Sequence, residues 1–229
     1  MIPKKIHYFW FGGAEKSDLE KECISRFSTF APEFEIKEWN EENFDVSQHP
    51  YTRAAYSKKK WAFVSDYARL KVLHDEGGIY LDTDMYLLKD LTEICSNHAF
   101  IGKEDATYIS AGIIGVEPKN DYIADVLLAY DKLLVRTPIP KILTEIYNKK
   151  NYELKVYEQA YFYPFTSESI KSFNKKNAPL EAYAVHMWNY SWGSPSSKFV
   201  KKVGLYRALK TASEKLRVKK ILKKVFNME

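Results

Sequence analysis

Two aspartates separated by one residue, Asp82 and Asp84, are the best candidates for chemistry in this sequence. They follow the apolar run Ile79–Leu81 in the stretch EGGIYLDTDMY. Two residues along a strand span about 6.6 Å and share a face, so both carboxylates would point the same way. Mg²⁺ or Mn²⁺ held jointly with a diphosphate suits such a site of few hard oxygen ligands. A turn with two solvated aspartates is the alternative.

A second pair of charged residues precedes the aspartates. Asp66 and Arg69 are three positions apart in a segment with helical periodicity, so they share a helix face. They could form a surface ion pair, which contributes little to stability. They could instead provide a carboxylate for ribose or sugar hydroxyls and a guanidinium for sugar or phosphate.

The segment HMWNYSWGS and the N-terminal Trp10 carry the remaining candidates. His186 can ligate a metal, Ser191 can provide an oxygen, and a tryptophan indole such as that of Trp192 can donate to a phosphate oxygen. Trp10 offers a flat face on which a nucleobase could stack. The alternative for these aromatic residues and for His186 is burial in the core.

Alternating strands and helices would position these residues. We predict strands at Ile6–Phe11, at FEIKEWN, at Ile79–Leu81 and at YISAGIIGVEP, and short late strands at AYFYPF and AYAVHMW. We predict helices beginning at Ser17, over Ser57–Asp75, and around 121–134 and 139–149, with Gly77 and Gly78 ending the second. This order predicts an α/β fold with a mainly parallel sheet, whose ligand crevice lies beyond the carboxyl ends of the strands.

Composition excludes several classes of protein. The 229 residues are 45% apolar and 15% aromatic, enough for one domain with a sizeable core. Two distant cysteines, Cys23 and Cys95, argue against a disulfide framework or a structural zinc site and fit a reducing compartment. The N-terminal apolar run is too short for a signal peptide, and no stretch of about 18 apolar residues occurs, so we expect a cytoplasmic location.

Charge is unevenly distributed along the chain. Residues 198–229 hold eleven Lys or Arg and two Glu, giving +9, whereas the whole chain carries +5 and residues 1–197 therefore −4. Apolar residues recur in this tail at roughly helical spacing, which predicts a basic amphipathic helix for an anionic membrane surface. A solvated helix packed on the body is the alternative, and we do not expect nucleic acid to be the partner. The domains would be 1–197 and 198–229.

Three blocks in this order resemble glycosyltransferase family 32, the group with a DXD-containing sugar-binding region. They are IPKKIHYFWFGG, SDYARLKVLHDEGGIYLDTDMYLLKDL and AVHMWNYSWGS, and the match runs along roughly residues 2–194. The glucosylating clostridial toxins are similar in layout. The resemblance implies a GT-A fold, meaning a Rossmann-like nucleotide-sugar domain with a divalent cation, usually Mn²⁺. It also implies retaining transfer of a hexose, with a UDP-sugar the expected donor.

The resemblance also implies roles for individual residues. Trp10 and its strand would hold the base, Asp66 and Arg69 would bind ribose and donor sugar, and Asp82 would bind ribose or sugar hydroxyls. The other implied roles are metal ligation by Asp84, a metal or diphosphate contact by His186, and closure over the diphosphate by Ser191 and Trp192. One departure is that the family commonly has a second histidine where Met187 stands and small residues at Asn189 and Tyr190.

The chemistry implied is stabilisation of the departing diphosphate by a cation and fixed donors. The acceptor would be a saccharide or lipid-linked saccharide in the assembly of a bacterial surface polysaccharide such as a capsule. Glu104, Asp105 and Glu158 are acidic residues near expected strand ends, and the sequence does not select among them. Two other readings stay open: a Mg²⁺-dependent phosphohydrolase with an aspartyl nucleophile at the D-x-D, and a non-enzymatic basic membrane-binding module.

Overall fold

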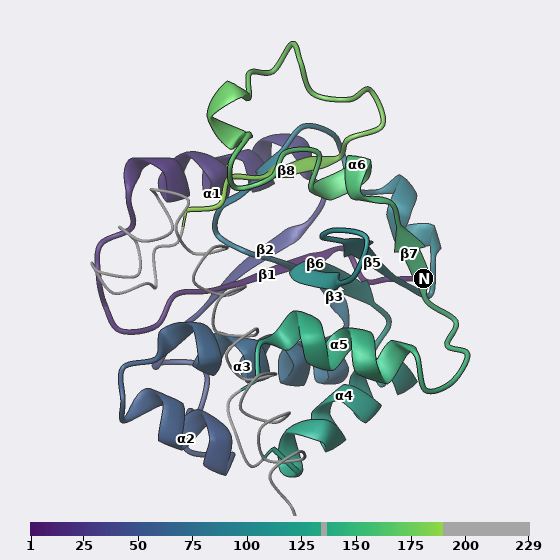
Figure 1. Ribbon diagram of the computed structural model, residues 1–229. Helices are drawn as coiled ribbons and strands as arrows, with labels where there is room; N and C mark the ends of the chain where they lie inside the picture. Colours follow the sequence, from purple (N-terminus) through teal and green to yellow (C-terminus); the bar gives the residue numbers. More distant parts are fainter. Residues whose placement is uncertain (134–136, 190–229) are drawn as a thin grey trace, which may run out of the picture. The chain divides into compact units, whose positions relative to one another are not determined.

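A six-stranded sheet forms the centre of the protein, which a computed structural model describes over residues 1–133 and 137–189 (Figure 1). Its strand order is β2-β1-β3-β6-β5-β7. The strands are β1 (Lys5–Phe9), β2 (Glu35–Trp39), β3 (Gly78–Leu81), β5 (Ala99–Lys103), β6 (Ile109–Val116) and β7 (Lys155–Tyr157). Three of the five strand pairs are parallel, and β6 runs antiparallel to both of its neighbours. The predicted α/β fold is confirmed, with β6 as the exception to parallel order.

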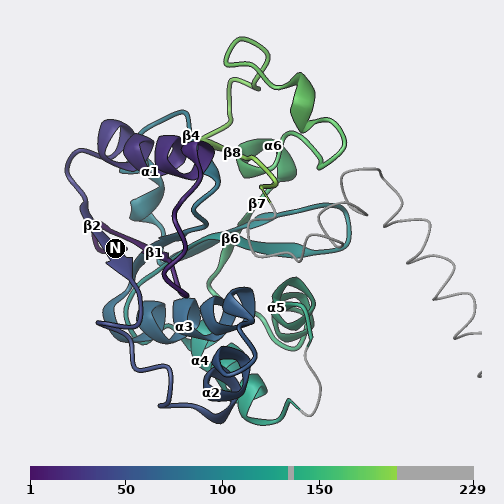
Figure 2. The same ribbon diagram turned by 90° about the vertical axis from the view of Figure 1, so that its left-hand side faces the viewer.

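Helices cover both faces of this sheet (Figures 1 and 2). One face carries α2 (Pro50–Tyr56), α3 (Trp61–Glu76), α4 (Asp121–Asp131) and α5 (Ile139–Tyr147). The other carries α1 (Asp18–Phe30), α6 (Gln159–Phe162) and a two-stranded antiparallel sheet of β4 (Met85–Leu87) and β8 (Ala184–His186). Two apolar clusters result, one on each side of the sheet. Because both faces are covered, β3 and β6 are buried along their whole length.

The start of α1 follows directly from its sequence. Ser17 caps the helix by accepting from the Glu20 N–H, and the Glu20 carboxylate accepts from the Ser17 N–H at 2.7 Å. This reciprocal pair is a capping box, as the Ser-x-x-Glu spacing predicts. Glu20 is almost fully buried, so the box fixes a buried carboxylate as well as the helix end.

The helix before the aspartates is shorter than predicted. It begins at Trp61 rather than Ser57, because Lys59 takes a positive φ of 52° and the preceding residues form the separate helix α2. It ends at Gly77, whose φ of +65° favours glycine. A Cβ at Gly77 would also lie 2.6 Å from the Pro118 side chain. Gly77 therefore permits the sharp entry into β3.

One predicted late strand is wrong. The first half of the segment AYFYPF lies in the one-turn helix α6, and Phe162 and Tyr163 are buried in the apolar cluster on this side of the sheet rather than paired in a strand. The segment AYAVHMW does contain a strand, β8, but in the small sheet. The segment between α6 and β8 begins and ends at neighbouring residues, because the Tyr183 N–H donates to the Tyr161 carbonyl at 2.9 Å.

Among the residues described, no helix combines the length and apolar character that crossing a bilayer requires. The predicted tail helix, residues 198–229, and the predicted domain boundary after residue 197 lie outside the described residues.

Candidate functional site

Asp82 and Asp84 lie in a turn between β3 and β4, not along a strand as predicted. Strand β3 ends at Leu81, and the Met85 N–H donates to the Asp82 carbonyl at 3.0 Å to close the turn. The Asp82 N–H donates to the Gly112 carbonyl of β6 at 2.8 Å. The turn therefore brings the two carboxylates together by folding back, beyond the carboxyl end of β3, where the sequence placed the ligand crevice.

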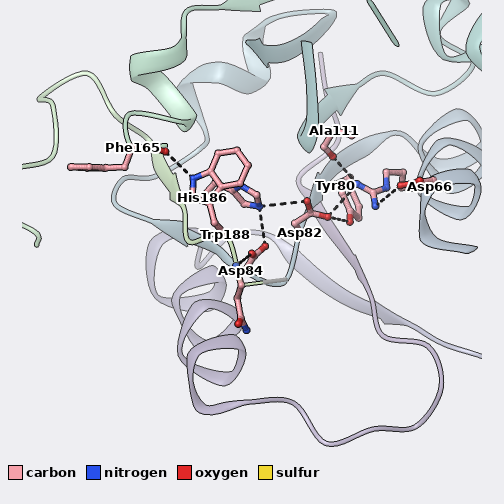
Figure 3. Close-up of polar contacts among 10 residues, drawn as sticks. Asp66, Tyr80, Asp82, Asp84, Ala111, Phe165, His186 and Trp188 are labelled. Carbon is pink, nitrogen blue, oxygen red and sulfur yellow. Dashed lines mark hydrogen bonds and ion pairs between the residues drawn. The ribbon is translucent and has the colours of Figure 1, made fainter. Parts of the chain in front are cut away.

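The small sheet places His186 beside both aspartates (Figure 3). Met85 of β4 pairs with His186 of β8, so His186 lies opposite the residue that directly follows the turn. His186 Nε2 lies 3.2 Å from Asp84 Oδ1 and 4.0 Å from Asp82 Oδ2. One ligand atom from each of the three residues lies within 4.8 Å of the others. Two carboxylate oxygens and an imidazole nitrogen are a donor set that fits Mn²⁺ or Mg²⁺.

Asp84 and His186 stabilise each other's charged forms. Burial raises the pKa of Asp84, but His186 and the Asn189 N–H outweigh burial and hold this pKa below its ordinary value. Burial lowers the pKa of His186, and Asp84 with the other nearby carboxylates outweighs it, so the pKa of His186 is raised. The His186 Nδ1 atom is buried without a hydrogen-bond partner in the described part of the chain.

Arg69 and Tyr80 hold Asp82, and Figure 3 shows Tyr80 on the side of Asp82 away from His186. Arg69 Nη1 lies 3.2 Å from Asp82 Oδ1 and donates to the Ala111 carbonyl at 2.9 Å. The Tyr80 hydroxyl donates to the same Asp82 oxygen, and the guanidinium stacks over the Tyr80 ring at 4.2 Å. Asp82 Oδ1 therefore accepts from both of these donors, and Asp82 Oδ2 faces His186.

Asp66 completes this arrangement from α3. Its Oδ1 lies 3.2 Å from Arg69 Nη2, and both side chains are buried. Burial raises the pKa of Asp66 to about 7, because Arg69 only partly offsets the loss of water and Asp82 adds repulsion. The predicted Asp66–Arg69 pair thus exists, but it is internal rather than a surface ion pair.

Gly112 leaves room for Asp82. A Cβ at this position would lie 2.8 Å from the Tyr163 hydroxyl and 3.1 Å from Asp82 Oδ2. The Tyr163 hydroxyl is buried and has no hydrogen-bond partner among the described residues. Burial raises its pKa, and the nearby Ser110 side chain and Ile113 backbone lower it in part. No sequence signal marked Gly112 or Tyr163, because the contact joins β6 to a segment about fifty residues away.

Asn189 connects Asp84 to the start of α1 through hydrogen bonds. Its N–H donates to Asp84 Oδ2 at 2.7 Å, and its side-chain amide lies 3.3 Å from both Ser17 Oγ and Glu20 Oε1. The preceding residue, Trp188, takes a positive φ of 55°, which is unusual for a bulky residue. Its indole N–H donates to the Phe165 carbonyl at 2.8 Å and its ring packs on His186 at 4.3 Å (Figure 3). These contacts hold the segment after β8 against the aspartates.

The remaining predicted residues are placed differently. Trp10 follows β1 but is only 6% exposed, and its indole N–H donates to the Ala14 carbonyl. Lys16 lies over the Trp10 ring at 5.3 Å. Ser191 and Trp192 lie outside the described residues. The structure thus brings together Asp66, Arg69, Asp82, Asp84 and His186, and adds Tyr80, Gly112, Tyr163 and Asn189.

Three acidic residues that the sequence left undecided are now distinguished. Asp105 is exposed and its carboxylate accepts from the Thr107 and Tyr108 N–H groups of its own turn. Glu158 is exposed and pairs with Lys103 at 2.6 Å. Glu104 is partly buried, and burial raises its pKa although His186 and Ser110 lower it in part.

Comparison with known proteins identifies the same region. Residues 17–101, which include both aspartates, match the family model described as "Glycosyltransferase sugar-binding region containing DXD motif". The chain is 29% identical over 234 residues to an uncharacterized glycosyltransferase, L373, of Acanthamoeba polyphaga mimivirus, covering 88% of this chain and 87% of that protein. The predicted resemblance is confirmed at this family level.

Two further similarities cover less of the chain. Lactosylceramide 4-alpha-galactosyltransferase of Mus musculus is 26% identical over 149 residues, covering 55% of this chain and 40% of that enzyme. The solved structure of PaToxG glycosyltransferase superposes with a TM-score of 0.54 at 21% identity, covering 65% of this chain and 69% of that one. The structural similarity confirms the predicted GT-A fold.

Proposed function

Because the chain is a glycosyltransferase of the DXD sugar-binding type, we propose that it transfers a hexose from a UDP-sugar to a saccharide acceptor, with retention. The retaining hexosyl chemistry is supported by the similarity to an alpha-galactosyltransferase. The acceptor we propose is a saccharide or lipid-linked saccharide of a bacterial surface polysaccharide. This setting comes from the family resemblance.

A cation site formed by Asp84 and His186 carries this proposal. The single supporting observation is that ligand atoms of Asp82, Asp84 and His186 lie within 4.8 Å of one another. Mn²⁺ or Mg²⁺ bound here would provide positive charge to the departing diphosphate. Because Asp84 raises the pKa of His186, a proton and the cation would compete for this imidazole.

Other residues of the chain would bind the remaining parts of the donor. Arg69 and Tyr80 hold Asp82 Oδ1, which leaves Oδ2 for a ribose or sugar hydroxyl. Asp66 would contact the donor beside them. Trp10 would hold the base mainly through the main chain at the end of its strand, because its ring is buried beneath Lys16. Ser191 and Trp192 would close over the diphosphate.

Nucleotide release from a panel of UDP- and GDP-sugars tests the proposal without any acceptor. We expect release that requires Mn²⁺ or Mg²⁺, is abolished by EDTA, and is fastest with one UDP-hexose. A parallel thermal-shift assay should show stabilisation by UDP only when Mn²⁺ is present. Metal-independent release, or none with any donor, would reject the proposed function.

The two alternative readings have less support. A phosphohydrolase would use the first aspartate as a nucleophile, whereas the region that holds Asp82 matches a glycosyltransferase sugar-binding family. A non-enzymatic basic module would leave the buried carboxylate cluster without a role. We retain the basic tail as a proposed dock on an anionic membrane. Deletion of residues 198–229 should then reduce binding to anionic liposomes while nucleotide release persists.

A further inference from the structure

The β5–β6 hairpin brings one more carboxylate to the site. Strand β5 ends at Lys103, and the Glu104 N–H donates to the Tyr108 carbonyl at 2.8 Å, so Glu104 lies directly across from the start of β6. The first residues of β6 form one wall of the site. The Ala111 carbonyl binds Arg69, the Gly112 carbonyl binds the Asp82 N–H, and the buried Ser110 precedes them.

The position of Glu104 relative to this wall is informative. Ser110 and Gly112 are two residues apart on β6 and so face the same side, and Gly112 faces Asp82 and Tyr163. Glu104 lies close enough to His186, Ser110 and Asp82 for these groups to act on its pKa, which His186 and Ser110 lower and Asp82 raises. Glu104 therefore lies beside the cluster, where the end of β5 meets the start of β6.

The chemical state of Glu104 differs from that of other acids near this edge. Among residues 1–133 and 137–189 no Lys or Arg forms an ion pair with it, whereas Glu158 pairs with Lys103 and Asp105 binds its own turn. A carboxylate that is partly buried and lacks a cationic partner is available for a substrate proton. Burial raises its pKa, which makes it a stronger base than an exposed glutamate.

We propose that Glu104 is a catalytic residue that accepts the proton of the incoming acceptor hydroxyl. In this step the hydroxyl oxygen bonds to the anomeric carbon from the face that the phosphate leaves, as retention requires, and the bond from that carbon to the phosphate oxygen breaks. The bonding electron pair leaves with the nucleoside diphosphate, and the hydroxyl proton passes to the Glu104 carboxylate, which later returns it to solvent. The inference rests on the proposed function.

Hydrolysis of the donor, with water as the acceptor, tests this role without a known acceptor. The probe is the UDP- or GDP-sugar that the wild type hydrolyses fastest with Mn²⁺. We expect Glu104→Gln to lower kcat about 100-fold while leaving the KM for the donor and the half-saturating Mn²⁺ concentration unchanged. Asp105→Asn, on the same hairpin, and Glu158→Gln, directly after β7, are matched controls and should change kcat by less than about 2-fold.

A second variant separates chemistry from folding. In Glu104→Ala, added formate should restore part of the lost kcat, because a small carboxylate can occupy the space and accept the proton. Unchanged kcat in Glu104→Gln, or a loss seen only in the donor KM or metal requirement, would overturn the role of Glu104. Absence of metal-dependent hydrolysis in the wild type would instead reject the proposed function itself.

Discussion

Arg69 Nη1 lies 3.2 Å from Asp82 Oδ1, and the neighbouring nitrogen of the same guanidinium lies 3.2 Å from Asp66 Oδ1. One cation thus joins a helix to the turn that carries the aspartates. The Arg69 side chain is also bonded to the carbonyls of Ser65 and Ala111. This buried network fixes Asp82 before any ligand arrives, so Arg69 has a structural role in addition to the donor contact proposed for it.

Replacing Arg69 should destabilise the protein strongly. In Arg69→Met two carboxylates lose their partner, one of them fully buried, and the free energy of unfolding should fall by about 3 kcal/mol. Urea denaturation measures this change. Lys71→Met, on the same helix, breaks only the partly exposed pair with Asp75 and should cost less than about 1 kcal/mol. Equal stability of Arg69→Met and wild type would contradict a central role for this network.

Replacing Asp84 should separate activity from folding. Asp84→Asn keeps an acceptor for the Asn189 N–H but removes the charge that would hold the cation, so metal-dependent nucleotide release should fall by about 100-fold or more. The melting temperature without metal should change little in comparison. Asp121→Asn, an exposed residue at the start of α4, should retain full release. Full activity of Asp84→Asn would remove the basis of the cation site.

Gly112 and Tyr163 should be energetically coupled. Gly112→Ala would force a Cβ to 2.8 Å from the Tyr163 hydroxyl, so it should cost about 1–3 kcal/mol and disturb Asp82. Tyr163→Phe removes a hydroxyl that has no hydrogen-bond partner among the described residues and should be nearly neutral. The double variant should recover much of the lost stability and nucleotide release. A coupling free energy near zero in this double-mutant cycle would show that the alanine is accommodated elsewhere.

His7 should make the protein less stable in mild acid. Its Nδ1 accepts from Trp39 Nε1 and its Nε2 bonds to the Gly77 carbonyl, so the buried ring is neutral. Burial lowers the pKa of His7, so the unfolded chain takes up a proton first as pH falls. This stability is present above the unfolded pKa, about 6.5, and is lost as pH falls toward the lower folded pKa.

The measurement is the free energy of unfolding from pH 7.5 to 5.5 in wild type and His7→Gln. The amide of glutamine can accept and donate but does not titrate. The wild type should lose up to about 1.4 kcal/mol per pH unit more than the variant below pH 6.5. Parallel curves for the two proteins would mean that His7 has the same pKa in the folded and unfolded states, which contradicts the prediction.

Local signals accounted for much of the fold. The Ser-x-x-Glu capping box at Ser17, the glycines after α3 and the long apolar runs of β3 and β6 each predicted an element that is present. The antiparallel direction of β6 could not be predicted, because an apolar run reads the same in either orientation. The segment AYFYPF was misassigned for a related reason, since aromatic residues suit a strand and a short buried helix equally.

The candidate site was predictable in part. Asp82, Asp84 and His186 were identified, yet the turn that joins the aspartates was predicted as a strand, because the spacing of the residues does not reveal the local Met85 N–H to Asp82 carbonyl bond that closes it. The contacts of Asn189 with residues 17, 20 and 84 could not be predicted, because they join distant parts of the chain and follow no sequence pattern. Glu104 was noted but became distinguishable from Asp105 and Glu158 only through burial and pairing.

The excursion from the end of α6 toward β8, residues 162–182, has a neck that is closed by the hydrogen bond from the Tyr183 N–H to the Tyr161 carbonyl. Its two ends are thereby fixed independently of what lies between them. Residues 166–181 can therefore be exchanged or lengthened as a cassette, provided that the packing of Ile170 and Phe173 against Tyr86 and Val185 is kept. Loop grafting at this neck then tests whether the excursion selects the molecule that is glycosylated in the proposed reaction.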